Sequence, residues 1–374
     1  MLHALSKIDA MNETLRDVAS LEEQHAQCLP GRFYTDPAYF AHEVETFLSK
    51  EWHCLGRADE VANPGDYFVT QLFNEPLLVV RGDDGAVRVL SNLCRHRGMP
   101  IATGTGSTRR FICGYHAWTY GRGGELLNAP RMRDKGVTEK NCSLPQFRSE
   151  VWNGFIYANL DDDAAPLTPR LGQLDHLLGN YRPSEMRFVR SFEEEWATNW
   201  KCLVENFMEA YHLSIVHPET LHPYTPTGLS RKSMSDDSFT SYCANYPDSA
   251  AARGQGADGL TEEERRRSTL FNLFPTQIAS QAASMLVSFS IKPLAVDRIA
   301  VRWTLSAYGD DLTQDELESR IALWHEVNRE KLEKMQLALS SRHAPSGQLA
   351  PRDYEGTIWD FYRYLGRQIP VGAA

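Results

Sequence analysis

The chain has 374 residues, enough for two or three domains, and its 39 Lys and Arg against 49 Asp and Glu give a net charge of −10. This acidic balance argues against nucleic acid as the main partner, because phosphate binding requires a basic surface. The sequence has neither an apolar run of about 18 residues nor a basic start followed by an apolar block. We therefore expect a cytoplasmic protein without a membrane span or a signal peptide.

The first part of the chain is expected to form a helix followed by a β domain. Apolar residues at helical spacing predict a helix over 35–50. From Trp52 to about Leu160, short β-branched and aromatic runs alternate with turn residues, which indicates a small all-β domain. The strands expected there are 67–72, 76–81, 87–91 and 155–160.

The remainder is expected to mix strands and helices. The expected elements are a strand over 187–192, a helix over 200–216, a surface loop over 248–267 and strands over 284–292 and 298–307. A long C-terminal helix should begin after Thr313, because Thr313 and Glu316 have the spacing of a capping box. The apolar stripe of this helix consists of Leu317, Ile321, Trp324 and Met335.

Two of the seven cysteines have the spacing of metal ligands. Cys94 is followed by His96 with one residue between them, and Cys113 by His116 with two. Zinc would accept two thiolates and two imidazoles, but structural zinc sites favour Cys-x-x-Cys pairs over this mixed order. A Rieske [2Fe–2S] cluster fits better, because two thiolates bind one of its irons and two imidazoles the other. An odd number of cysteines also argues against a disulfide framework.

The sequence around these ligands resembles a known family. The segments CRHRG and CGYHAWTY, with G-x-L-x-x-A-P beginning at Gly124, are similar to the large (α) subunit of the Rieske non-haem iron oxygenases. The resemblance covers most of the chain and implies an α+β fold. An all-β [2Fe–2S] domain over 48–160 would precede a catalytic domain over 161–374, with a curved antiparallel sheet and covering helices of the helix-grip type. Residues 1–47 would be a helical part of that catalytic domain.

A second group of candidate ligands lies on the helix expected over 200–216. Glu209, His212 and His217 form the pattern E-x-x-H-x(4)-H. Two histidines and a carboxylate are the ligand set of mononuclear Fe(II) sites that keep open positions for O2. Pro218 disfavours helical geometry at His217, so the helix should end there and let the second imidazole turn toward the same metal.

The resemblance also implies a role for each residue of this group. His212 and His217 would bind mononuclear Fe(II). Glu209 would be the carboxylate that carries electrons from a cluster histidine, His116 or His96, of one subunit to the iron site of its neighbour. Most dioxygenase-type members have Asp at that position, whereas this chain has Glu. Such a bridge implies a ring of subunits, and we expect a homotrimer.

The third iron ligand departs from the family pattern. In the family it is an Asp about eight residues before a Gln, and the residue eight before Gln336 is Asn328. Asn328 also continues the apolar stripe, whereas Glu326 and Glu330 lie on roughly the opposite side of the helix. We therefore expect the neutral amide of Asn328 as the ligand. Glu326 or Glu330 after a register shift, a water molecule, or another residue remain alternatives.

Two classes of substrate suit the expected pocket. Its candidate residues are Met208, Leu213, Phe271, Phe274, Trp303 and Trp359. Aromatic side chains can stack on an aromatic ring or attract a quaternary ammonium group through cation–π interactions. The resemblance is closer to the carnitine and glycine betaine oxygenases than to other members, which favours hydroxylation or oxidative demethylation of a small quaternary ammonium compound. An aromatic acid is the alternative substrate.

The resemblance further implies an O2-dependent monooxygenase or dioxygenase with a redox partner. Electrons would come from NAD(P)H through a flavin or iron–sulfur reductase. A docking patch for this reductase is expected where positive charge gathers near His96 and His116, at Arg95, Arg97, Arg109 and Arg110. Two other classes stay open. One is a Rieske electron-transfer protein with an impaired iron site, and the other is a zinc-bound structural protein.

Overall fold

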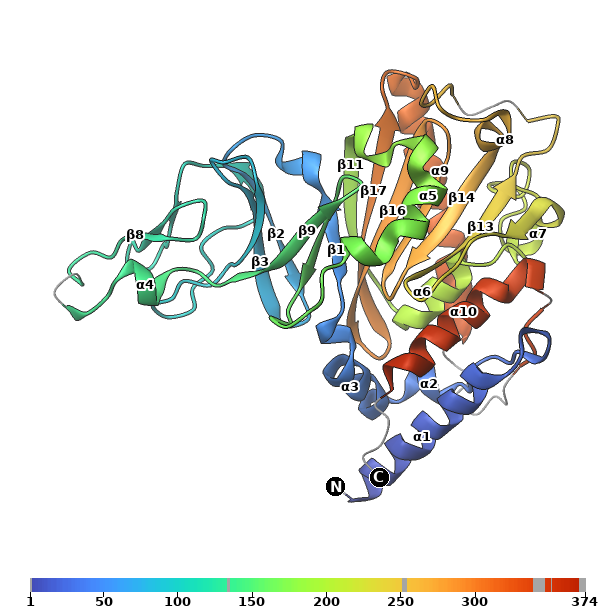
Figure 1. Cartoon of the computed structure of the whole chain (residues 1–374), viewed down its shortest axis with the longest axis horizontal. Coiled ribbons are helices and arrows are strands. Elements are labelled where there is room, and N and C mark those ends of the chain that lie inside the picture. Colours follow the sequence, from blue (N-terminus) through green and yellow to red (C-terminus); the bar gives the residue numbers. More distant parts are fainter. Residues whose placement is uncertain (1, 133–134, 251–253, 339–346, 351, 370–374) are drawn as a thin grey trace. The chain divides into compact units, whose positions relative to one another are not determined.

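The chain folds into two compact units. The computed structural model describes residues 2–132, 135–250, 254–338, 347–350 and 352–369. One unit is the continuous segment Lys50–Leu167, and the other joins Met1–Ser49 to Thr168–Ala374. Each unit contains its own antiparallel sheet (Figure 1). None of the described helices is both long and apolar enough to cross a membrane.

The unit Lys50–Leu167 is all-β apart from short helical turns. Its main sheet has the strand order β1-β10-β9-β4-β3-β2-β5 among the described residues, and β6-β7-β8 form a smaller sheet. The main strands are β1 His53–Arg57, β2 Asp66–Leu72, β3 Glu75–Arg81, β4 Val87–Ser91, β5 Thr105–Ser107, β9 Gln146–Trp152 and β10 Phe155–Asn159. The smaller sheet consists of β6 Phe111–Ile112, β7 Thr119–Tyr120 and β8 Leu126–Asn128. The four strands predicted from the sequence are confirmed within one or two residues.

Strand β3 explains why this unit has two apolar cores. Alternate side chains of a strand point to opposite faces of the sheet. Leu77 and Val79 pack in one buried cluster, whereas Leu78 and Val80 pack in another. The second cluster also contains Cys94 and Cys113, so the loops that carry these cysteines lie over an apolar core.

The other unit is an antiparallel sheet covered by helices. In the described part of the chain its strand order is β11-β17-β16-β15-β14-β13-β12. The strands are β11 Met186–Trp196, β12 Ser230–Lys232, β13 Phe239–Asn245, β14 Arg267–Leu273, β15 Gln277–Gln281, β16 Met285–Ala295 and β17 Arg298–Tyr308. The main helices are α1 Leu2–Ser20, α3 Pro37–Thr46, α5 Gly172–Leu178, α9 Gln314–Ala338 and α10 Arg352–Gln368. The expected α+β fold is confirmed, and α1 packs against α10.

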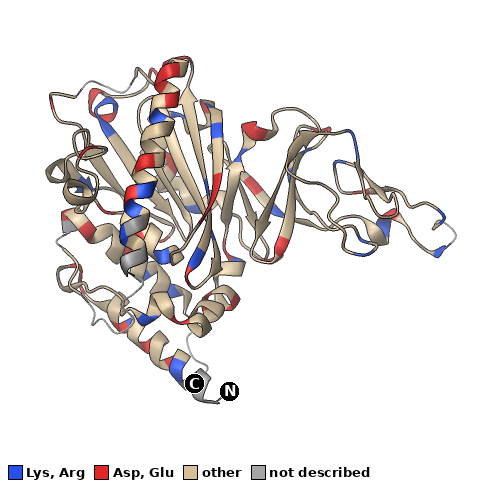
Figure 2. Cartoon of the chain, turned by 180° about the vertical axis from the view of Figure 1, so that it is seen from behind, with Lys and Arg blue, Asp and Glu red and all other residues tan. Residues whose placement is uncertain are grey.

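Helix α9 begins and packs as the sequence predicts. Thr313 and Glu316 make the expected capping box, with the Thr313 N–H donating to the Glu316 carboxylate at 2.9 Å and the Glu316 N–H to the Thr313 hydroxyl at 3.3 Å. The ring of Trp324 packs 5.7 Å from that of Phe289 on the sheet. Acidic and basic residues are mixed along α9 (Figure 2). The apolar stripe therefore faces the sheet and the charged side faces away from it.

The prediction of one continuous helix over 200–216 is wrong. The chain forms α6 Trp200–Phe207 and the short α7 Leu213–Val216, with a non-helical segment between them. The carbonyls that this break releases are bound by side chains from elsewhere. Tyr242 donates to the carbonyl of Phe207 at 3.3 Å, Thr227 to that of Ala210 at 2.8 Å, and Thr357 to that of Met208. These tertiary hydrogen bonds compensate for the missing helical ones.

The surface loop predicted over 248–267 is also partly ordered. Thr261 caps a short helix, α8 Glu262–Arg265, through a capping box with Glu264. The Asn180 amide donates to both carboxylate oxygens of the buried Glu264, at 3.0 and 3.1 Å. The helical turn is therefore held against the domain. Residues 251–253 of the expected loop lie outside the described residues.

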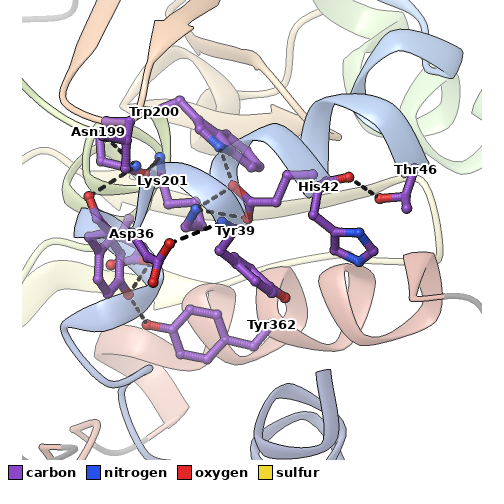
Figure 3. Close-up of polar contacts among 12 residues, drawn as sticks. Asp36, Tyr39, His42, Thr46, Asn199, Trp200, Lys201 and Tyr362 are labelled. Carbon is purple, nitrogen blue, oxygen red and sulfur yellow. Dashed lines mark hydrogen bonds and ion pairs between the residues drawn. The ribbon is translucent and has the colours of Figure 1, made fainter. Parts of the chain in front are cut away.

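A buried ion pair fixes α6 against α3. The Lys201 ammonium donates to both carboxylate oxygens of Glu43, at 2.8 and 2.9 Å, and both side chains are almost fully buried. Asn199 caps α6 by accepting from the Lys201 N–H at 3.0 Å, and Trp200 donates to Glu43 at 3.4 Å (Figure 3). Breaking such a pair leaves an uncompensated buried charge. The helix that leads into the candidate iron site is thus rigidly placed.

Candidate metal centres

Two loops of the β unit have matching geometry. The Cys94 N–H donates to the carbonyl of Met99 at 2.9 Å, and the Cys113 N–H to that of Trp118 at 2.8 Å. Each cysteine carbonyl also accepts from the N–H four residues on, that of Gly98 or Ala117. Both of these residues have positive φ, +70° at Gly98 and +56° at Ala117. The two loops therefore have the same backbone turn after the cysteine, although the histidine stands two residues after Cys94 and three after Cys113.

The four predicted cluster ligands come together at the ends of these loops. Cys94 and Cys113 are buried, each with 3% exposure. The Nδ1 atoms of His96 and His116 lie 3.1 Å apart, and His116 is exposed to solvent. The ring of His96 stacks on that of Trp118 at 5.0 Å between centroids. Two buried thiols and two nearer-surface imidazoles are the donor set of a Rieske [2Fe–2S] cluster, so the residues fit the group.

Tyr120 is a contact of this site that the sequence did not indicate. Its hydroxyl lies 3.3 Å from the Cys94 sulfur and accepts from the Arg95 N–H at 3.0 Å. Burial raises the pKa of the Cys94 thiol, and the hydrogen bond from Tyr120 opposes that shift. A hydroxyl donor beside a cluster sulfur is one of the features that set a cluster's potential.

In the sheet-and-helix unit, Glu209 lies in the break between α6 and α7 and holds His212. One carboxylate oxygen contacts the His212 Nδ1. The other accepts from the N–H groups of Tyr211 and His212, at 2.5 and 3.1 Å. Glu209 is therefore not one helical turn from His212 on a continuous helix, as the sequence suggested, but caps the turn that His212 opens. Its contact leaves the Nε2 of His212 available.

His217 is held in an equivalent way from another element. Its Nδ1–H donates to Oε2 of Glu330 on α9 at 2.6 Å, and the same oxygen accepts from the Thr220 hydroxyl at 2.7 Å. Burial lowers the pKa of His217, which keeps the imidazole neutral. The rings of His212 and His217 lie 5.2 Å apart. Metal-binding histidines characteristically donate their second ring N–H to such a carboxylate.

The expected third ligand is a buried amide. Asn328 is 3% exposed, and neither its Oδ1 nor its Nδ2 has a hydrogen-bond partner among the described residues. Of the two alternatives, Glu326 pairs with Arg329, whereas Glu330 orients His217. No third Asp, Glu, Cys or His joins His212 and His217 in a metal-binding group within the described part of the chain. Two imidazoles and a buried amide oxygen are donor types that Fe(II) accepts. Asn328, however, is not among the residues that line the cavity beside His212 and His217.

A pocket adjoins the two imidazoles, and its empty space is about 310 Å³ when the open solvent at its mouth is included. Of the residues expected around the substrate, Leu213 lies on its wall. Trp303 packs instead on Phe192 at 4.2 Å, and Phe274 on Tyr364 at 4.6 Å, so these rings belong to the core. The lining residues are Asn206, Phe207, Glu209, His212, Leu213, His217, Leu221, Tyr242, Leu270, Trp324, Val327 and Lys331.

A small β domain with paired Cys and His, combined with a sheet-and-helix domain that presents two carboxylate-bound imidazoles, defines a Rieske-type oxygenase subunit. The family described as "Ring hydroxylating alpha subunit (catalytic domain)" matches residues 183–370, and "Rieske [2Fe-2S] domain" matches residues 51–148. The chain belongs to the family of ring-hydroxylating oxygenase α subunits, as the resemblance predicted. Its two domains are those that bind a Rieske [2Fe–2S] cluster and mononuclear iron.

The relatives include one named for carnitine and one named for benzene. The carnitine monooxygenase oxygenase subunit of Escherichia coli (strain K12) is 32% identical over 199 residues, 52% of this chain and 53% of that protein. Benzene 1,2-dioxygenase subunit alpha of Pseudomonas putida is 32% identical over 204 residues, 52% and 45% of the two chains. The chain thus spans about half the length of the curated relatives it matches. A crystal structure of a quaternary ammonium Rieske monooxygenase has a TM-score of 0.83 at 22% identity, covering 94% of this chain and 98% of that one.

Proposed function

We propose that the protein is the terminal oxygenase component of a Rieske oxygenase system. It would insert one atom of O2 into a C–H bond of a small substrate, as a hydroxylation or an oxidative demethylation. The other oxygen atom would leave as water, with two electrons and two protons consumed. The observation that carries the proposal is the pairing of His212 and His217 with Glu209 and Glu330, because both imidazoles then offer their Nε2 atoms beside one cavity.

We assign the ligands as follows. Cys94, Cys113, His96 and His116 would hold the [2Fe–2S] cluster, and His212, His217 and Asn328 the iron. When bound, the two groups supply electrons and the reductive activation of O2. The chain's own contribution is to orient the imidazoles, to keep His217 neutral and to line the cavity with apolar side chains that exclude water.

Glu209 would have a second role in an assembly of subunits. Its carboxylate already contacts the His212 imidazole, and it is almost buried, with 8% exposure. In a homotrimer the same carboxylate would meet His116 or His96 of a neighbouring subunit and connect the two metal centres. The exposure of the His116 ring leaves it free to make such a contact.

The electron donor would be a flavin or iron–sulfur reductase that takes electrons from NAD(P)H. Four arginines near the cluster loops are all exposed: Arg95, Arg97, Arg109 and Arg110. Opposite charge on the partner would speed its encounter with this patch, and added salt would slow it. Replacing Arg109 and Arg110 by Glu should therefore slow reduction of the cluster by the reductase without changing its spectrum.

The test combines spectroscopy with oxygen uptake. The reduced protein should give the electron paramagnetic resonance spectrum of a Rieske cluster, and iron analysis should exceed the two atoms of that cluster. With a reductase, trimethylammonium compounds and aromatic acids should be screened for substrate-dependent O2 uptake and for the hydroxylated or demethylated product. An iron-free protein without the Rieske spectrum would refute the proposal.

A second candidate function follows from Asn328. Without a carboxylate ligand the iron site would carry one more positive charge than the usual site and bind Fe(II) less firmly. The chain would then be a Rieske electron-transfer protein with an impaired iron site. Single-turnover O2 uptake separates the two candidates, because an electron carrier reduces its partner but forms no product.

A further inference from the structure

Lys331 occupies an unusual place on the wall of the cavity. It lies on α9, three residues after Asn328, and is only 2% exposed. Four aromatic rings surround its ammonium. The distances from Nζ to their centroids are 4.6 Å for Phe289, 5.5 Å for Phe207, 5.6 Å for Trp196 and 5.9 Å for Trp324. Faces of aromatic rings attract cations, so this cage favours a cation at its centre.

The ammonium has no anion to pair with in the described part of the chain. The acidic residue that raises the pKa of Lys331 is Glu194, which accepts from the indole N–H groups of Trp303 and Trp196, at 3.0 and 2.8 Å. Burial lowers the pKa of Lys331 to about 7. A buried, unpaired ammonium is costly, and the cation–π contacts offset only part of that cost. An anion bound beside it would remove the penalty.

Lys331 is also the only cationic side chain among the residues that line the cavity in the described structure. The acidic group among them, Glu209, is already bound to His212 and two backbone N–H groups. With a neutral amide at position 328, the proposed iron would not be balanced by a carboxylate ligand. With that iron bound, the cavity would have an excess of positive charge, which favours an anion and disfavours a cation.

We propose that Lys331 binds a carboxylate of the substrate, and that its ammonium fills the aromatic cage that would otherwise attract a quaternary ammonium group. This inference rests on the proposed function, because it assigns the substrate class of the same site. It deepens that function by making a carboxylate the required group. A quaternary ammonium compound that also carries a carboxylate could bind to Lys331 in this way only with its cationic end away from the four rings.

The test compares pairs of ligands that differ in the carboxylate. Dissociation constants are measured by isothermal titration calorimetry without reductase, so that no turnover occurs. Benzoate is compared with benzamide, and glycine betaine with choline. The wild type should prefer the acid in at least one pair, and that pair identifies the source of the carboxylate. Lys331→Met should weaken binding of that acid by about 30-fold or more, because it removes one partner of a buried charge pair. Binding of the analogue without a carboxylate should change less than about 3-fold.

Two further variants complete the design. Lys334→Met removes an exposed lysine one turn along the same helix and should leave all four constants unchanged. Lys331→Arg keeps the positive charge and should retain the preference for the acid. This variant tests the role of the charge even if Lys331→Met is destabilised and has a lowered Tm. Equal acid preference in Lys331→Met and wild type, or no acid preference in the wild type, would overturn the inference. A protein that selects the acid but never oxidises it would instead contradict the proposed function.

Discussion

The Nδ1–H of His217 donates a 2.6 Å hydrogen bond to Glu330, which lies 113 residues further along the chain on α9. This bond joins the short helix α7, which has the two histidines at its ends, to the helix that carries Asn328. The Thr220 hydroxyl donates to the same carboxylate oxygen at 2.7 Å and fixes its position. Glu330 is therefore best described as a positioning residue for His217. One alternative from the sequence, Glu330 as the third ligand, is less consistent with this geometry.

Glu330→Gln should lower the affinity for Fe(II) by about 10- to 100-fold, because a neutral amide oxygen is a weaker acceptor for the ring N–H of His217 than a carboxylate. The measurement is Fe(II) binding in competition with a chelator. Glu326→Gln is the matched control on the same helix, since Glu326 pairs with Arg329 rather than with a histidine. If Glu326→Gln lost iron and Glu330→Gln did not, the assignment of the two glutamates would be wrong.

Tyr120→Phe should lower the reduction potential of the Rieske cluster. The hydroxyl lies 3.3 Å from the Cys94 sulfur, and a donor there stabilises the more negative, reduced cluster. A hydrogen bond worth about 1 kcal/mol corresponds to about 40 mV for one electron. A redox titration followed by electron paramagnetic resonance measures the shift. Tyr67→Phe is the control, because this ring packs on Phe111 in the same core. A shift of equal size there would show that packing and not the hydrogen bond sets the potential.

Glu205 should make the stability of the protein depend on pH. It lies on α6, accepts from the Tyr34 hydroxyl at 2.8 Å, and burial raises the pKa of its carboxyl from 4.5 to about 7. The folded state then holds a proton that the unfolded state releases between these values. The stability associated with the protonated carboxyl is fully present below about pH 4.5 and is lost as the pH rises through 7.

Glu205→Gln mimics the protonated carboxyl and should remove this loss. Above pH 7 the variant should be more stable than the wild type by about 3 kcal/mol, whereas near pH 4.5 the two should be alike. Urea unfolding at a series of pH values measures the difference. Glu13→Gln, on the exposed surface of α1, should follow the wild type throughout. A constant difference between Glu205→Gln and the wild type at every pH would contradict the prediction.

The parts of the site that could be predicted are those with short-range patterns. The cluster ligands fall in two short loops, and the spacing of Leu317, Ile321 and Trp324 already placed Asn328 on the buried side of α9. Lys331 continues the same stripe three residues later. A lysine on the apolar face of a helix is visible in the sequence and could have indicated a residue with a special role. Its significance depends on rings from α6 and the sheet, which are distant in sequence and meet only in the fold.

The break between α6 and α7 could not be predicted for a similar reason. Apolar spacing continues from Trp200 through the segment around Glu209, so local periodicity favours one helix. The break is stabilised instead by hydroxyl groups of Thr227, Tyr242 and Thr357, which bind the released carbonyls from later parts of the chain. The consequence reaches the site, because Glu209 caps a new turn and so orients His212.

Asn328→Asp tests the third ligand. A carboxylate at this position would add the negative charge that the two imidazoles lack and should raise the affinity for Fe(II), whereas Asn328→Ala should lower it. Asn206 is the comparison residue, because it lines the cavity, whereas Asn328 does not, and its buried Oδ1 also has no partner among the described residues. Iron content and chelator competition should respond to Asn328→Ala and not to Asn206→Ala. Full iron content in Asn328→Ala would exclude the Asn328 amide as a ligand. Loss of iron in Asn206→Ala alone would identify Asn206 on α6 as the third ligand instead.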